Sequence, residues 1–128
     1  MASHDLRQRT FQFACRIVKV CRKLSAGGTV HRQFAHQLIR SGTSIGANFE
    51  EAHAAHSRRE FACKLSLVLR EARETHYWLR LVAASELAER SEIQDVVSEA
   101  DELVAIFTST VRKAKQPLAV KSSGDVAT

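Results

Sequence analysis

Apolar residues recur every three or four positions over long segments of this chain, and this spacing constrains its fold more than any other feature. The spacing is clearest in the series Ile93, Val97, Ala100, Val104, Phe107, Val111 and Ala114. Residues spaced in this way lie on one face of an α-helix. The chain also contains only one proline and five glycines, which are few breakers for a turn-rich β architecture. The sequence therefore predicts an all-α protein built from long amphipathic helices.

Turn and capping signals divide the chain into four predicted helices. Gly27 and Gly28 separate the first helix from the second. Ser57 and Ser91 are each followed three residues later by Glu or Gln, the spacing of a capping box that opens a helix. The predicted helices span residues 5–24, 29–56, 57–87 and 91–116. Short connections make sequential neighbours antiparallel, so we expect an up-down-up-down four-helix bundle.

The length of the chain fits one compact domain, because 128 residues are too few for two domains of ordinary size. We assign residues 1–116 to the bundle and expect residues 117–128, which begin with the single proline, to form a flexible C-terminal tail. No stretch approaches the ~20 apolar residues of a membrane span, and the N-terminus lacks the apolar stretch of a signal peptide. These features predict a cytoplasmic protein with no contact to a membrane.

The three cysteines, Cys15, Cys21 and Cys63, do not have the spacing of a disulfide framework or of a zinc site. We expect them to be reduced, buried thiols. No residue pattern in the chain predicts a metal site or a cofactor.

Two glycines, Gly42 and Gly46, lie inside the second predicted helix. Each costs a helix roughly 1 kcal/mol relative to alanine, so their presence calls for a compensating reason. Close approach by another helix is such a reason, because glycine has no side chain to hold two backbones apart. We therefore predict close helix packing at these positions.

The third predicted helix has two apolar faces. One stripe consists of Phe61, Leu65, Val68, Ala72, Leu79 and Ala83. A second stripe, formed by Leu67, Trp78 and Leu81, lies roughly 130° away around the helix. A four-helix core covers only the first stripe, and an exposed apolar patch rimmed by charge usually marks a protein contact. We therefore predict that Leu67, Trp78 and Leu81 form the interface of a closed homo-oligomer.

Residues 37–48, which read Gln-Leu-Ile-Arg-Ser-Gly-Thr-Ser-Ile-Gly-Ala-Asn, strongly resemble the signature of the bacterial four helix bundle protein family. That family includes proteins encoded by intervening sequences of large-subunit ribosomal RNA genes. A second match covers residues 71–75 and 77–79, and the resemblance extends from about residue 11 to residue 115. The chain departs from the usual pattern at Ala52, where a glycine commonly closes the motif. The resemblance implies a bundle that forms a cyclic homopentamer with no assigned enzymatic activity.

A seam of polar side chains is predicted beside the apolar stripe of the second helix. Its members Arg40, Ser44, Asn48 and Glu51 project within roughly 80° of one another. One interpretation is a site for a ligand or for RNA. The other is a structural network at a border between helices or subunits, in which Arg40 pairs with Glu71 or Glu74. The flanking glycines favour the structural interpretation.

Four carboxylates have the spacing of a metal-dependent nucleotide hydrolase. Their order, E-x-x-E followed by E-x-x-D, resembles that of all-α nucleotide pyrophosphohydrolases and is formed by Glu71, Glu74, Glu92 and Asp95. The second pair opens the fourth helix, while the first lies well before the end of the third. At 1.5 Å per residue the pairs are roughly 20 Å apart, too far to share a metal. We therefore expect no catalytic residues and no metal site.

The net charge of +5 permits binding to a phosphate-rich partner. In the predicted topology, eight basic residues gather at one pole of the bundle: Arg7, Arg9, Arg58, Arg59, Lys64, Arg112, Lys113 and Lys115. A cyclic oligomer would repeat this pole around its axis as a ring. The leading hypothesis is therefore a non-enzymatic oligomeric module that binds RNA or DNA. The alternatives are a protein-interaction scaffold without nucleic-acid binding and, more distantly, a metal-dependent nucleotide hydrolase.

Overall fold

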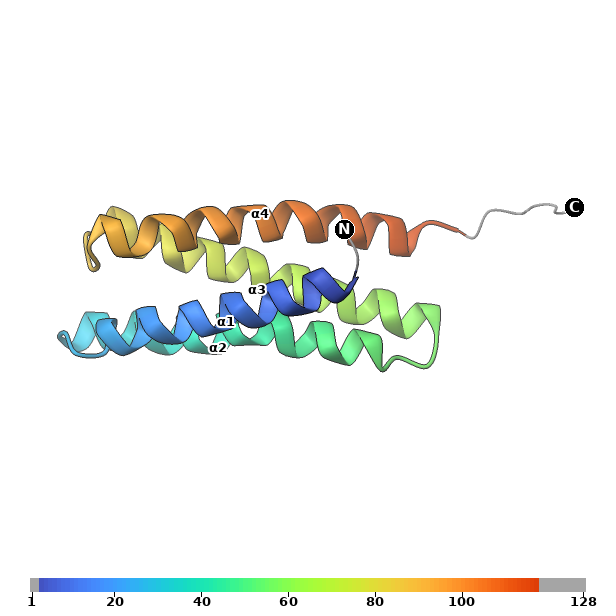
Figure 1. The fold of residues 1–128 in the computed structure, drawn as a ribbon, viewed down its shortest axis with the longest axis horizontal. Helices are drawn as coiled ribbons and strands as arrows, with labels where there is room; N and C mark the ends of the chain where they lie inside the picture. The colour runs from blue at the N-terminus through green and yellow to red at the C-terminus, as the bar shows by residue number, and fades with distance from the viewer. Residues whose placement is uncertain (1–2, 118–128) are drawn as a thin grey trace, which may run out of the picture.

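The computed structural model describes residues 3–117 and folds them into four α-helices. These are α1 (Ser3–Leu24), α2 (Thr29–His53), α3 (Arg58–Ala84) and α4 (Arg90–Lys115). The α1–α2 and α3–α4 connections lie at one end of the molecule and the α2–α3 connection lies at the other (Figure 1). No β-strand occurs in the part of the chain that the structure describes, so the predicted all-α class is confirmed. Of the predicted C-terminal tail, residues 118–128 lie outside the described residues.

A continuous hydrophobic core fills the space between the helices. Its largest fully buried side chains are Phe13, Ile17, Leu38, Ile45, Leu65, Leu79, Ile93, Leu103 and Phe107. Phe49 and Phe107 pack edge to face across α2 and α4, with ring centroids 5.2 Å apart. On α3, Val82 is buried and the predicted core residue Ala83 is exposed. The buried stripe of α3 is therefore rotated slightly from its predicted position at the C-terminal end.

No helix among the described residues is long and apolar enough to cross a bilayer.

The helix ends confirm one predicted cap and contradict the other. The Ser57 side chain accepts a hydrogen bond from the Glu60 amide at 3.0 Å, so α3 begins as predicted. The capping box at Ser91 is wrong, because α4 already begins at Arg90 behind an N-cap, Glu89, that makes no side-chain bond. The reason lies in the preceding turn. There the Leu87 amide bonds the Val82 carbonyl at 3.1 Å and Glu86 adopts a φ of 57°, a Schellman motif that ends α3 at Ala84.

The cysteines lie in different environments. Cys21 is buried, and its thiol lies 3.4 Å from the Ala35 carbonyl oxygen. Burial raises the pKa of the Cys21 thiol to about 11, because a buried thiolate loses its hydration. Cys15 and Cys63 are exposed, which contradicts the expectation that all three thiols are buried. Both lie on the outer surfaces of their helices.

The two interior glycines of α2 lie against α1, as the sequence predicted. A β-carbon built at Gly42 would lie 2.8 Å from two carbon atoms of the Ile17 side chain, closer than real carbons approach. At Gly46 the nearest atom is the Thr10 carbonyl oxygen, 3.4 Å from such a β-carbon. Gly42 is therefore required for the observed separation of α1 and α2, whereas Gly46 leaves just enough room for a methyl group. Ala52, which stands where a glycine commonly closes the family motif, is buried within α2, and the helix continues past it to His53.

Gly42→Ala and Gly46→Ala should change stability in opposite directions. Both substitutions gain helix propensity worth about 1 kcal/mol. At Gly42 the methyl group collides with Ile17, and overpacking of a core typically costs about 1–3 kcal/mol, so we expect net destabilisation. At Gly46 we expect an unchanged or slightly raised free energy of unfolding. Urea unfolding followed by circular dichroism would measure both, and equal effects of the two substitutions would contradict this account.

Candidate nucleic-acid interface

The predicted polar seam is a contact between α2 and α3. Arg40 Nη1 lies 3.5 Å from Glu71 Oε1, and Arg40 Nη2 also pairs with Glu74. Ser44 and Asn48 instead bond the backbone of their own helix, at 2.6 Å and 2.9 Å. Glu51 is exposed on the same helix. The seam therefore consists of one arginine between two carboxylates, with Ser44 and Asn48 beside it.

Glu71 is the most constrained member of this seam. It is almost completely buried, and its Oε1 atom receives no hydrogen bond, although Arg40 is close enough for an ion pair. Glu74 accepts a second bond at 3.0 Å from the indole N–H of Trp78. The seam and Trp78 thus form one connected network at the α2–α3 border. This arrangement favours a structural role over a ligand site.

The residues predicted to form an oligomer interface lie along the outer edge of the same border. Trp78 is half-buried and packs edge to face on Phe34 of α2, with ring centroids 5.8 Å apart. Leu67 and Leu81 are also half-buried. Tyr77, beside Trp78, is 52% exposed. Part of the Trp78 surface is therefore used within the subunit, and Leu67 and Leu81 are the better candidates for a contact between copies.

The basic pole lies at the end of the molecule that holds the α2–α3 connection. The first turns of α3 and the last turn of α4 form a groove of about 680 Å³ there. Arg58, Arg59 and Lys115 line it, together with small side chains such as Ala62 and Ala114. Arg112 and Lys113 are exposed on the same last turn of α4, and Lys64 is half-buried on α3. Among residues 3–117, no carboxylate lines this groove.

Arg7 and Arg9 do not contribute free positive charge to this pole. Arg7 forms a two-pronged pair with Glu50, at 2.6 Å and 3.2 Å, which raises the pKa of Arg7 and lowers that of Glu50. Arg9 bonds Glu99 at 2.6 Å and 2.9 Å and Glu102 at 2.6 Å. Hydrogen bonding to Glu99 is the largest cause of the raised pKa of Arg9. Because glutamates already pair with both guanidinium groups, the structure favours Arg7 and Arg9 less as nucleic-acid contacts than the other predicted basic residues.

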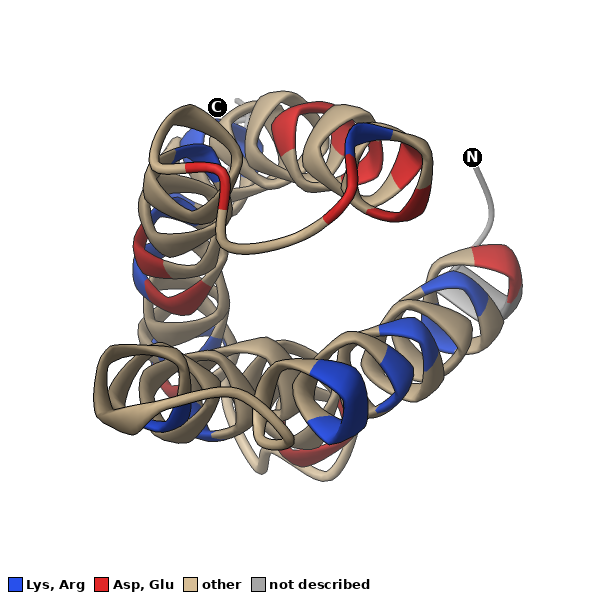
Figure 2. Ribbon diagram, turned by 90° about the vertical axis from the view of Figure 1, so that its left-hand side faces the viewer, with Lys and Arg blue, Asp and Glu red and all other residues tan. Residues whose placement is uncertain are grey.

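The pair between Arg9 and α4 also bridges the most open side of the bundle. Helix α1 packs mainly on α2 and touches α4 much less. Figure 2 shows the two helices apart on this side, with Lys and Arg bands along α1 and Asp and Glu bands along α4. The Arg9 pairs and the pair between Lys23 and Glu92 join them across this side. Charge complementarity holds α1 against α4 where apolar packing is limited.

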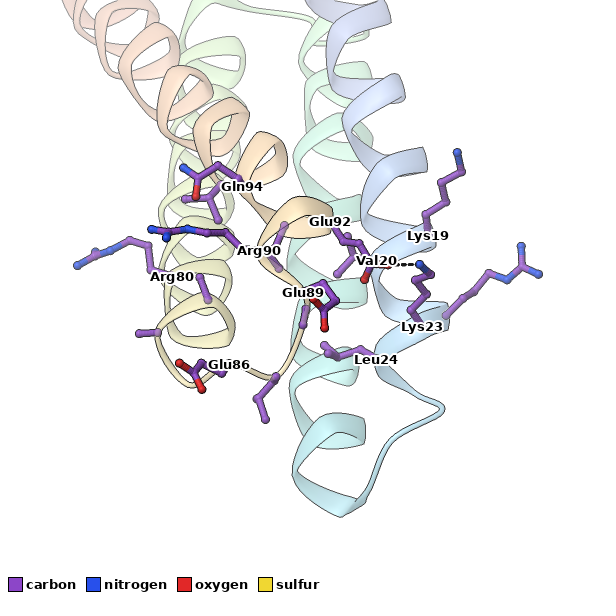
Figure 3. Close-up of a pocket in the computed structure, with 17 residues that line it drawn as sticks. Lys19, Val20, Lys23, Leu24, Arg80, Glu86, Glu89, Arg90, Glu92 and Gln94 are labelled. Carbon is purple, nitrogen blue, oxygen red and sulfur yellow. Dashed lines mark hydrogen bonds and ion pairs between the residues drawn. The ribbon is translucent and has the colours of Figure 1, made fainter.

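A second, larger pocket of about 1540 Å³ lies between the end of α1 and the α3–α4 connection. Its apolar wall includes Val20, Leu24 and Leu87. Figure 3 shows acidic and basic side chains around the rim of this pocket. Lys23 reaches toward Glu92, and the Arg80 side chain extends away from the pocket. This pocket has no signal in the sequence, because its shape depends on the course of the α3–α4 turn. Its mixed rim charges do not select an anion or a cation.

The four carboxylates with hydrolase-like spacing do not meet in one site. Glu71 and Glu74 pair with Arg40 on α2, whereas Glu92 pairs with Lys23 on α1. Asp95 is exposed on α4. Within the described residues, no group of three or more His, Cys, Asp or Glu side chains is arranged to hold a metal ion. Glu71, Glu74 and Glu92 therefore serve as ion-pair partners between helices.

The outer face of α3, which was not among the predicted sites, carries a row of exposed arginines. A periodic signal for it exists, because Arg59, Arg73 and Arg80 are separated by multiples of seven residues, as are Arg70 and Tyr77. Seven residues correspond to nearly two helical turns, so such residues share a face. This pattern runs along the helix, whereas the predicted basic pole gathers charges at one end of the bundle.

The family model described as 23S rRNA-intervening sequence protein matches residues 3–109. A crystal structure of a protein of unknown function from the S23 ribosomal protein family of Bacteroides thetaiotaomicron is similar to this chain, with 33% sequence identity and a TM-score of 0.78. The alignment covers 88% of this chain and 99% of that protein. No curated protein matches the sequence.

Proposed function

Since this chain belongs to the family of 23S rRNA-intervening sequence proteins, we propose that it is a non-enzymatic, homo-oligomeric module that binds nucleic acid. The bundle is up-down-up-down, and the assembly is a closed ring, a homopentamer by the family resemblance. The binding site is the groove at the basic pole. Neither the family description nor that of the similar crystal structure specifies an enzymatic activity.

The observation that favours nucleic acid is the composition of this groove. Arg58, Arg59 and Lys115 line it, and none of its lining residues that the structure describes is a carboxylate. Elsewhere in the described structure, Arg7, Arg9 and Arg40 each pair with glutamate. Arginine presents a planar fork of donors that matches a phosphate group, and such contacts supply most of the sequence-independent affinity for nucleic acid. The groove therefore suits a phosphate backbone.

Ring closure would strengthen this weak site. A single groove with three basic residues gives a modest affinity, but a cyclic assembly repeats the groove around its axis. A nucleic acid bound to one groove is then held at high effective concentration near the next one. We expect binding with little sequence preference and a steep loss of affinity with salt, because the contacts are with the backbone.

Reversal of four charges at the pole tests the site. We expect the variant Arg58→Glu, Arg59→Glu, Arg112→Glu, Lys113→Glu to bind RNA at least about tenfold more weakly than the parent at low salt. A matched control reverses Lys19, Arg22, Arg32 and Arg90, which are exposed at the opposite end of the molecule and give the same change in net charge. The control should retain more affinity than the pole variant. Fluorescence anisotropy at several salt concentrations would measure both.

Three outcomes are informative. Equal losses in the two variants would show that net charge, not the groove, determines binding. Unchanged binding in the pole variant would contradict the proposed site. An oligomer that binds no RNA at low salt would instead favour the second candidate, a protein-interaction scaffold. The exposed apolar side chains of Phe11, Val30 and Tyr77 favour that candidate, because large exposed apolar side chains often contact proteins.

A further inference from the structure

The outer face of α3 is almost uniformly basic. Ten residues of this helix are exposed, and five of them are arginines, whereas one, Glu60 in the first turn, is acidic. The ten are Arg58, Arg59, Glu60, Cys63, Arg70, Arg73, Tyr77, Arg80, Ala83 and Ala84. Beyond the first turn, all the exposed charges of α3 are therefore positive.

Four of these arginines form a line with an aromatic residue in it. At 100° per residue, Arg59, Arg70, Arg73 and Arg80 fall within an arc of roughly 80° on the helix surface. Tyr77 lies inside the same arc, one turn beyond Arg73 and one turn before Arg80. At 1.5 Å per residue the line from Arg59 to Arg80 is about 30 Å long. We call these five residues the arginine track.

The charges of the track are not neutralised within the described structure. None of the four arginines forms an ion pair there, and the carboxylates of Glu71 and Glu74 are directed to Arg40 on α2. Like charges three or four residues apart on a helix repel one another, and Arg70 and Arg73 have this spacing. An anionic partner would relieve that repulsion. Arg59 also lines the groove at the basic pole, so the track continues from it.

Tyr77 gives the track a second chemical property. Tyr77 is 52% exposed, and its ring contacts Trp78 edge to face, with ring centroids 5.5 Å apart. The rest of the ring faces solvent among the arginines. Exposed aromatic rings surrounded by cationic side chains are typical of surfaces on which unpaired bases stack. A polyanion that offers only charge would leave this ring unused.

We propose that the arginine track binds single-stranded nucleic acid, with phosphates on Arg59, Arg70, Arg73 and Arg80 and a base stacked on Tyr77. This inference rests on the proposed function and specifies its substrate as a single strand. A duplex keeps its bases stacked inside, so it would contact the arginines but not the face of the Tyr77 ring. The track therefore distinguishes single strands from duplexes by one aromatic contact.

The test compares a mixed-sequence 20-nucleotide RNA with a duplex of the same sequence. Stacking of one base contributes about 1–3 kcal/mol, so Tyr77→Ala should weaken binding of the single strand by about 5–150-fold and leave duplex binding unchanged. Tyr77→Phe keeps the ring and should bind like the parent. The double variant Arg70→Gln, Arg73→Gln should weaken binding of both RNAs and reduce the salt dependence, because it removes phosphate contacts. All three substituted residues are exposed, so the variants should fold.

The outcomes separate this inference from the proposed function. If the parent binds neither RNA, both fail. Suppose that the parent binds RNA, the pole variant does not, and the Tyr77 and Arg70/Arg73 variants bind like the parent. The arginine track is then not a binding site, and the groove at the basic pole remains the proposed site. Equal loss of single strand and duplex on Tyr77→Ala would overturn the stacking contact. If Tyr77→Ala dissociates the oligomer in light scattering without a selective loss of single-strand binding, Tyr77 is a subunit contact and the inference fails.

Discussion

Replacing Leu67 and Leu81 together by glutamate should convert the assembled protein into folded monomers. Both side chains are half-buried on α3, and they share one apolar stripe of this helix with Trp78. In a ring they would be covered by the neighbouring copy. Burial of an unpaired carboxylate there would cost several kcal/mol for each interface, whereas solvent hydrates the same carboxylate in a monomer. Light scattering should show a fall from the oligomer to the monomer mass with unchanged helical content.

The matched control is Ala83→Glu with Ala105→Glu. Both alanines are exposed, on α3 and α4, so this variant adds the same charge at surfaces that we do not place in the interface. It should remain assembled. A parent protein that is monomeric at tens of micromolar would contradict the assembly outright. Unfolding of the Leu67/Leu81 variant would show instead that these residues stabilise the subunit itself.

Trp78 is a less specific probe of the interface than its place in the second apolar stripe indicates. It packs on Phe34 within the same subunit, and its indole N–H bonds Glu74. A glutamate at this position would therefore bring a third carboxylate close to Glu71 and Glu74 and weaken the α2–α3 border in the monomer. The division of α3 into one core face and one interface face is thus too simple at Trp78.

A ring also needs a second, different surface on each subunit, because its contacts are heterologous. The outer face of α1 provides an apolar candidate. Phe11 is 68% exposed and Val18 is 39% exposed, and they lie seven residues apart on the same side of α1. Cys15, one turn from each, is also exposed. We expect this face to contact the Leu67 and Leu81 edge of the next copy.

The sequence predicted the helices and the close packing at Gly42 because these features depend on local spacing. Apolar periodicity determines which residues face the core, and an interior glycine indicates a close neighbour. The contrast between Ser57 and Ser91 shows the limit of such signals. Both have the spacing of a capping box, but the turn at Glu86 ends α3 early and lets α4 begin before Ser91. A turn with a positive φ at a glutamate has no reliable local signature.

The charged residues were harder to assign from sequence. Placing Arg7 and Arg9 at the basic pole follows from topology, but their pairing with Glu50 and Glu99 depends on how α1 is rotated against α2 and α4. The rotation of a helix about its own axis is set by how its side chains pack in the core. The spacing of apolar residues in the sequence gives this rotation only to within a fraction of a turn. The arginine track could have been found from sequence, because its residues repeat at seven-residue intervals on one helix.

Arg40→Ala should destabilise the protein more than loss of any exposed ion pair. Arg40 is the only residue seen to pair with the buried Glu71 in the described structure, and it also pairs with Glu74. Breaking a buried pair by removing one partner costs about 3–5 kcal/mol. Because the Arg40 side chain is itself 45% exposed, water can partly replace it, and we expect a loss of roughly 2–4 kcal/mol.

Neutralising the carboxylates should reverse most of that loss. In Arg40→Ala with Glu71→Gln and Glu74→Gln, no charge remains without a partner, so the triple variant should unfold at a higher urea concentration than Arg40→Ala alone. Arg7→Ala is the matched control, since Arg7 is about as exposed as Arg40 and also pairs with a glutamate of a neighbouring helix. Its partner Glu50 is 51% exposed, however, so we expect the unfolding midpoint of this variant to equal that of the parent. If Arg40→Ala leaves the midpoint unchanged and weakens RNA binding instead, the seam is a ligand site and its structural interpretation is wrong.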